Sequence, residues 1–150
     1  MTTRLAILAF ALAIPAAYAD VPNACEVLKV EDINSIAGNT VEKVQQQKTG
    51  NPSVCAYTDS RRGAILVLSI REVQYAAEQE LQLERENLEK IYKSRVKWLA
   101  AVGENGFWMP VNKQLVFRKG KRIVSVTFSR VANQNEVDTA QVARMVEARL

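Results

Sequence analysis

The spacing of apolar residues changes several times along the chain, and three stretches have helical spacing. In residues 25–37 apolar side chains recur at nearly helical intervals until Gly38, which predicts a first helix that ends there. Residues 74–95 form the longest helical pattern, with acidic residues at its start and basic residues at its end, an order that opposes the helix macrodipole. Residues 135–150 predict a closing helix.

Strand patterns fill the stretches between these helices. The predicted strands are residues 39–49, 53–58, 64–70, 96–102, 107–111, 114–118 and 122–129. The third is a nearly continuous apolar run and therefore a buried central strand, whereas the last alternates apolar residues with Ser and Thr. A turn is expected at residues 103–106. Because the connections between strands are short, the order helix, three strands, helix, four strands, helix predicts an α+β fold, an antiparallel β-sheet flanked by helices.

The first nineteen residues have a different pattern. Arg4 precedes an apolar run, Leu5 to Ile14, and Ala17-Tyr18-Ala19 provides a small-residue cleavage site before Asp20. This is the anatomy of a secretory signal peptide. We therefore expect residues 1–19 to be a cleaved bacterial leader and residues 20–150 to be a single exported domain, periplasmic or secreted.

Two anchored forms are alternatives to a cleaved leader. A retained membrane anchor fits poorly, because the apolar run is about half of the roughly 20 residues that a spanning helix needs and Pro15 ends it. A lipid anchor would need a lipobox directly before a cysteine, and Cys25 follows Pro22-Asn23-Ala24 instead. We expect no transmembrane segment in the mature form.

Composition narrows the classes of function. The whole chain has 20 basic and 16 acidic residues, and removing the leader with Arg4 leaves 19 against 16, a mild excess that does not indicate a nucleic-acid partner. Histidine is absent, which removes the commonest general base and the commonest metal ligand. Cys25 and Cys55 predict one disulfide in an exported chain; a redox or metal pair would need closer spacing or more ligands.

The sequence contains no pattern typical of an enzyme. Without histidine there is no Ser–His or Cys–His nucleophile, and no nucleophile elbow, phosphate loop or dinucleotide motif is present. Glu31-Asp32 and the glutamates of residues 74–95 are the available carboxylate clusters, and acidic residues at helix starts explain both. We expect a protein that is not an enzyme and that binds no cofactor or metal.

Two candidate binding surfaces remain. Phe107 and Trp108 are adjacent on a predicted strand, with Trp98 nearby in sequence, so one of the two side chains is expected in the core and the other outside as a binding anchor. The alternative is that both fill the seam between sheet and helix. The second candidate is a basic hairpin tip, which either contacts an anionic partner or is a solvated turn that protects strand edges. Its cations are Arg118, Lys119, Lys121 and Arg122.

Several short motifs resemble those of the LpqN-like lipoprotein domains, small exported bacterial domains of unknown function. The matching segments are Cys25–Leu28 opening a helix, Ile33–Gly38 ending it, Val54–Tyr57 in a strand, Val102–Trp108 around a turn, and Ala140–Leu150 as the last helix. The resemblance implies a PsbP-like α/β/α sandwich and carries no agreed catalytic residues.

These observations favour a non-enzymatic binding or interaction module of the periplasm or the secreted fraction. The expected partner is an envelope protein or an anionic surface. The alternatives are an exported inhibitor or immunity-type protein that blocks one enzyme or toxin, and a small-ligand carrier, which would need a closed apolar pocket.

Overall fold

The computed structural model describes residues 21–38, 40–61, 63–128 and 136–150. The predicted leader, residues 1–19, lies outside them. The order of elements is the expected one, except that the first helix is in two pieces. The elements are α1 (Ala24–Val27), α2 (Val30–Ala37), β1 (Lys43–Lys48), β2 (Ser53–Thr58), β3 (Ala64–Glu72), α3 (Ala77–Tyr92), β4 (Lys97–Leu99), β5 (Glu104–Met109), β6 (Gln114–Lys119), β7 (Arg122–Phe128) and α4 (Glu136–Glu147).

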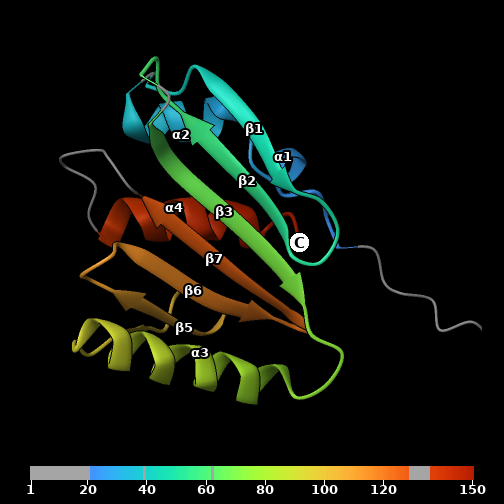
Figure 1. The fold of residues 1–150 in the computed structure, drawn as a ribbon, viewed down its shortest axis with the longest axis vertical. Helices are drawn as coiled ribbons and strands as arrows, with labels where there is room; N and C mark the ends of the chain where they lie inside the picture. Colours follow the sequence, from blue (N-terminus) through green and yellow to red (C-terminus); the bar gives the residue numbers. More distant parts are fainter. Residues whose placement is uncertain (1–20, 39, 62, 129–135) are drawn as a thin grey trace, which may run out of the picture.

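One seven-stranded sheet in the order β1-β2-β3-β7-β6-β5-β4 forms the centre of the molecule, and every neighbouring pair is antiparallel. The two runs of consecutive strands, β1 to β3 and β4 to β7, are each a meander. They join where β3 pairs with β7, so α3 connects two strand groups that lie side by side (Figure 1). The strands are antiparallel because short connections can join antiparallel neighbours but are too short for the crossover that parallel neighbours need.

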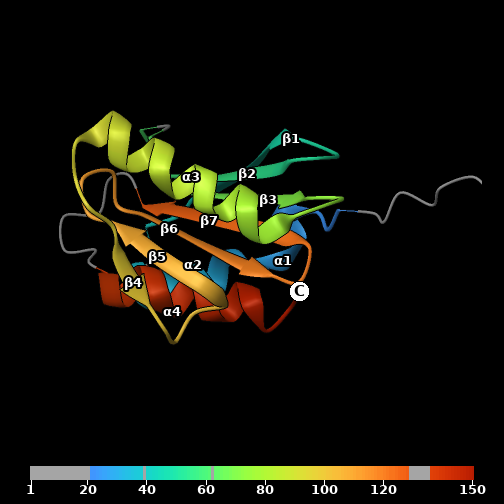
Figure 2. The ribbon, with the colours of Figure 1, turned by 90° about the horizontal axis from the view of Figure 1, so that it is seen from below.

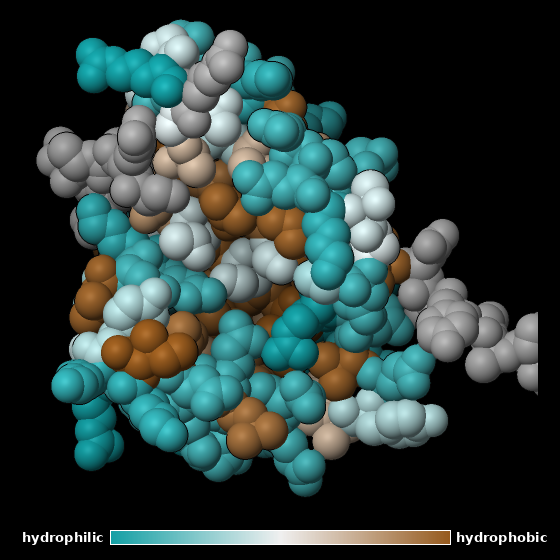
Figure 3. All heavy atoms as spheres, viewed as in Figure 1, coloured by the Kyte–Doolittle hydropathy of each residue, from teal (hydrophilic) through white to brown (hydrophobic). Residues whose placement is uncertain are grey.

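Helices flank both faces of the sheet, but unequally. Figure 2 shows α1, α2 and α4 on one face and α3 on the other. On its face, α3 contacts β5, β6 and β7, so the half formed by β1, β2 and β3 has no described helix over it. Figure 3 views this open half, where apolar and near-neutral residues gather at the centre with hydrophilic residues around them. The α+β prediction of an antiparallel sheet flanked by helices is confirmed.

The hydrophobic core follows this unequal covering. A large cluster lies between the sheet and the three helices α1, α2 and α4. A small cluster lies between the sheet and α3, and it consists of Leu81, Phe107, Val116 and Ile123. The alternation predicted for the last strand is present in β7: Val124, Val126 and Phe128 are buried in the large cluster, and Ser125 and Thr127 are half-buried on the opposite face. Ser129 lies outside the described residues.

Several boundaries differ from the sequence prediction: β4 covers only 97–99 of the predicted strand 96–102, and β5 covers 104–109 instead of 107–111. The first helix breaks at Leu28, whose backbone is extended at φ −121° and ψ 124° and whose side chain is buried. The expected turn at residues 103–106 is wrong after its first residue, because β5 already begins at Glu104. Gly106 pairs with Leu99 of β4, and a Cβ there would lie 2.3 Å from the carbonyl oxygen of Val102, so glycine serves close packing at this position.

Candidate functional site

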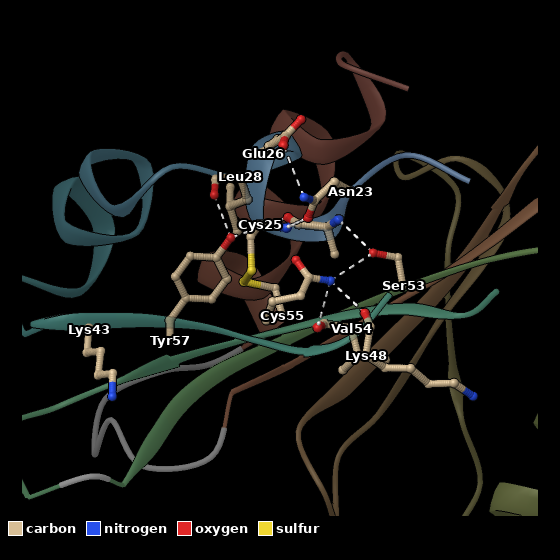
Figure 4. Close-up of a disulfide and its surroundings, with 12 residues drawn as sticks. Asn23, Cys25, Glu26, Leu28, Lys43, Lys48, Ser53, Val54, Cys55 and Tyr57 are labelled. Atoms are coloured by element: carbon tan, nitrogen blue, oxygen red, sulfur yellow. Dashed lines mark hydrogen bonds between the residues drawn. A yellow bond between two sulfur atoms is a disulfide. The ribbon is translucent and has the colours of Figure 1, made fainter. Parts of the chain in front are cut away.

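Three alternate residues of β2 attach α1 to the sheet. Ser53, Cys55 and Tyr57 point to the same face because side chains alternate along a strand (Figure 4). Cys55 forms the disulfide with Cys25, with Cα atoms 5.1 Å apart. Ser53 Oγ accepts a hydrogen bond from the backbone N–H of Ala24 at 2.9 Å, and Tyr57 donates to the Leu28 carbonyl at 2.5 Å. The predicted disulfide is confirmed, and it is one of three ties.

Two charged residues, Asp32 and Arg149, lie beside these contacts at the junction between α1 and α2. Burial, and then the negative charge of Asp32, raises the pKa of Tyr57 far above its usual value, so its hydroxyl stays protonated and remains a donor. The hydrogen bond from Arg149 lowers the pKa of Asp32, and that bond also raises the pKa of Arg149. Arg149 also donates to the Val27 carbonyl at 2.9 Å. These residues therefore join the end of α4 to the junction between α1 and α2.

Phe107 and Trp108 are both buried, with exposed fractions of 0% and 5%. They do point to opposite faces of β5, but each face is covered there: Phe107 packs with Leu81 of α3, and Trp108 belongs to the large core cluster. The expectation that one of the two rings is an external anchor is therefore wrong. The alternative, that they fill the seams between sheet and helices, describes their positions.

The basic hairpin lies between β6 and β7 as expected, but most of its cations have partners within the chain. Arg118 forms an ion pair with Glu104 on β5. Lys119 and Arg122 donate to backbone carbonyls at and just beyond the end of α4, at 2.8 and 2.6 Å. Lys121 is exposed and has no ion pair among the described residues. Arg122 also forms an ion pair with Glu72 at 3.9 Å. Three of the four cations thus have partners within the chain, and two of these three are paired with a carboxylate.

Trp98, on β4 next to β5, is exposed: 57% of its surface is accessible to solvent. It lies on β4 opposite Phe107, and the two ring centroids are 6.2 Å apart in an edge-to-face arrangement. The guanidinium of Arg85 lies 5.3 Å from the centroid of the indole ring. Edge-to-face and cation–π contacts each contribute roughly 0.5–1 kcal/mol at such sites. The ring is therefore held in one orientation while its remaining surface faces solvent.

Trp98 lies between two grooves at the β4 edge of the sheet. One, of about 330 Å³, separates α3 from β4 and β5 and is lined in part by Gln82 and Asn105. The other, also of about 330 Å³, separates β4 from α4 and includes the exposed Val137. An ion pair of 2.8 Å between Lys97 and Glu136 connects β4 to α4 beside this second groove. We call Trp98, Val137 and the two grooves the Trp98 surface.

Sequence reasoning considered Trp98 only as a neighbour of the Phe107-Trp108 pair. The alternation of a strand predicts opposite faces for adjacent residues, but it does not tell which faces a helix covers. Trp98 follows Lys97, and both lie on a strand of three residues at a sheet edge. In the sequence, the available signal was a tryptophan directly after a lysine.

Among residues 21–38, 40–61, 63–128 and 136–150, no group of three or more acidic or cysteine side chains is placed to hold a metal ion. No helix within these ranges has the length and apolar character required to cross a bilayer. Comparisons with protein-family models, curated proteins and solved structures gave no match to this chain.

Proposed function

We propose that this chain is an exported, non-enzymatic interaction module that recognises an envelope protein through the Trp98 surface. The observation that carries the proposal is an oriented, 57% exposed tryptophan between two grooves. Tryptophan is among the residues most enriched at energetic centres of protein interfaces, because it buries a large area with few rotatable bonds. Holding the ring against Phe107 and Arg85 lowers the entropy lost on binding.

Export is part of the proposal. The leader pattern of residues 1–19 and the disulfide between Cys25 and Cys55 support it together, since disulfides persist in oxidising compartments outside the cytoplasm. The resemblance to the exported LpqN-like domains is consistent with the same compartment.

A photo-crosslinking residue at position 98 tests the proposal in the native envelope. We expect irradiation to give one discrete adduct, because the side chain at this position contacts the partner directly. The matched control places the same residue at position 75, where Tyr75 is 83% exposed and lies before α3. Position 75 should give no such adduct.

A second substitution makes the result specific for the surface. Val137→Asp puts a charge beside the second groove, in the first turn of α4, where acidic residues are compatible with the helix. We expect this variant to lose the adduct while its circular dichroism spectrum stays unchanged. The proposal fails if positions 98 and 75 give the same adducts, or if the adduct at 98 survives in Val137→Asp.

The identity of the captured protein then separates the interaction module from the inhibitor. If the partner is an enzyme or toxin whose activity falls on binding, the inhibitor is the correct class. A partner without such activity supports the interaction module.

A further inference from the structure

One end of the molecule brings two connections together that are distant in sequence. Lys97 of β4 pairs with Trp108 of β5, and Met109 of β5 pairs with Gln114 of β6. The connection from α3 to β4, residues 93–96, and the turn from β5 to β6, residues 110–113, therefore lie at the same end of neighbouring strands. The end of α3 leads into the first of them.

This end is rich in cations and contains no acid of its own. Residues 90–98 and 110–113 include five Lys or Arg and no Asp or Glu. Lys97 pairs with Glu136, whereas the other four cations have no ion pair among the described residues. The preceding acid, Glu89, accepts the backbone N–H of Val96 at 3.0 Å and pairs with Arg85, so it does not neutralise them. The four unpaired cations are Lys90, Lys93, Arg95 and Lys113.

Exposed apolar side chains accompany these cations. Ile91 is 68% exposed and Val111 is 57% exposed, and Tyr92 is also exposed. We call this set, Ile91, Tyr92, Val111 and the four unpaired cations, the strand-end patch. Large exposed aliphatic residues gain free energy when they leave water. The basic hairpin at the β6–β7 turn lacks this combination, because three of its cations have partners within the chain.

We propose that the strand-end patch docks on the surface of a bilayer that contains anionic phospholipid. Lys90, Lys93, Arg95 and Lys113 would contact headgroup phosphates, and Ile91 and Val111 would enter the boundary between headgroups and acyl chains. A bilayer offers negative charge and an apolar layer at one surface, which matches both components of the patch. This proposal goes beyond the Trp98 surface and does not depend on its partner.

Vesicle flotation with the proposed exported form, residues 20–150, tests the proposal. We expect binding to vesicles of 70% phosphatidylcholine and 30% phosphatidylglycerol, weak binding to pure phosphatidylcholine, and a loss of binding at high salt. The triple variant Lys93→Glu, Arg95→Glu and Lys113→Glu should lower the partition coefficient on anionic vesicles by roughly a hundredfold, since each cation contributes about fivefold near such a surface.

A matched triple variant distinguishes the patch from net charge. Lys43→Glu, Lys48→Glu and Lys121→Glu changes the net charge equally at three exposed positions on β1 and the β6–β7 hairpin. We expect it to retain most of the binding. Every variant lacks the predicted leader, residues 1–19, whose apolar run would itself bind vesicles, so a difference between variants reports the substituted positions. Equal losses in the two triple variants would overturn the proposal.

The apolar component has its own test. Ile91→Ser with Val111→Ser removes two exposed side chains and no charge, and we expect about a tenfold lower partition on anionic vesicles with salt dependence retained. Unchanged vesicle binding in this variant, or a wild-type chain that binds neutral and anionic vesicles equally, would contradict bilayer docking. The vesicles contain no envelope protein, so vesicle binding does not depend on a partner of the Trp98 surface, and the two proposals fail separately.

Discussion

At the scale of single residues, both the backbone conformation and the packing at position 103 require glycine. Its backbone has φ +55°, a conformation that favours glycine. A Cβ there would lie 2.3 Å from Phe117 Cδ2 and 2.8 Å from the carbonyl oxygen of Arg118. Its N–H also donates to Glu147 Oε2 at 3.0 Å, which ties this turn to α4. Glycine at this position therefore allows the positive φ and the close approach of the turn to β6, and the turn is also hydrogen-bonded to α4.

Gly103→Ala is expected to lower the free energy of unfolding by about 3 kcal/mol, the sum of overpacking and a strained backbone. Gly120→Ala is the matched control, because Gly120 has φ +58° but nothing within 4 Å of the added Cβ. It should cost only about 1 kcal/mol. Urea unfolding measures both. Equal losses would show that the contact with Phe117 does not limit this position.

At the scale of elements, the attachment of α1 explains why a four-residue helix persists. A helix this short is not stable alone, because nucleation costs more than its few hydrogen bonds return. Ser53, Cys55 and Tyr57 hold it from alternate positions of β2. The disulfide closes a separation of 30 residues, which corresponds to roughly 3–4 kcal/mol in the chain-entropy account.

Replacing both cysteines, Cys25→Ala with Cys55→Ala, should therefore lower the free energy of unfolding by about 3 kcal/mol or more. Wild-type protein in reductant should lose a similar amount, and Tyr57→Phe, which keeps the disulfide, should lose about 1 kcal/mol. Guanidinium unfolding compares the three. A reduced wild-type protein as stable as the oxidised one would contradict a stabilising role for the disulfide.

At the scale of the whole molecule, the two faces of the sheet are stabilised unequally. The face of α1, α2 and α4 has the large core, and α4 alone buries five residues. On the other face, α3 has sixteen residues but only Leu81 fully buried. Its contacts with β5, β6 and β7 are few compared with those between strands. Local opening follows the amount of buried apolar contact, so α3 should be the less stable layer.

Hydrogen exchange measures this difference directly. Amides of α3 should exchange through openings with a lower free energy than amides of α4 or of the β3–β7 pair, by about 2 kcal/mol or more. Leu81→Ala should widen the gap, whereas Val142→Ala in α4 should lower the protection of the whole molecule. Equal protection of α3 and α4 in the unmodified chain would show that the sheet and both layers open together.

Much of this architecture is local information. Apolar periodicity located every strand and the helices α3 and α4, and it gave the bounds of β2 without error. Short connections predicted the antiparallel sheet, and two cysteines in a chain with a leader pattern predicted the disulfide. These features depend on residues that are close in sequence or on the number of cysteines, so they can be predicted from a single sequence.

The site could not be predicted in the same way. The exposure of Trp98 and the burial of Trp108 depend on the register of β4 with β5 and on which strands α3 and α4 cover. The carbonyl of Leu28, where the first helix breaks, accepts a hydrogen bond from a hydroxyl of β2, 29 residues away.

The sequence by itself determined which elements form, their order and the covalent tie between the first helix and the second strand, because periodicity, turn residues and cysteine pairing act over short distances or by simple count. Only the tertiary structure decided which side chains remain available to a partner. Among the residues that the structure describes, it engaged three cations of the β6–β7 hairpin, left the four cations of the strand-end patch without an ion pair, and exposed one tryptophan of two. Exposure is a property of what packs on top of a residue, and that cover comes from distant parts of the chain.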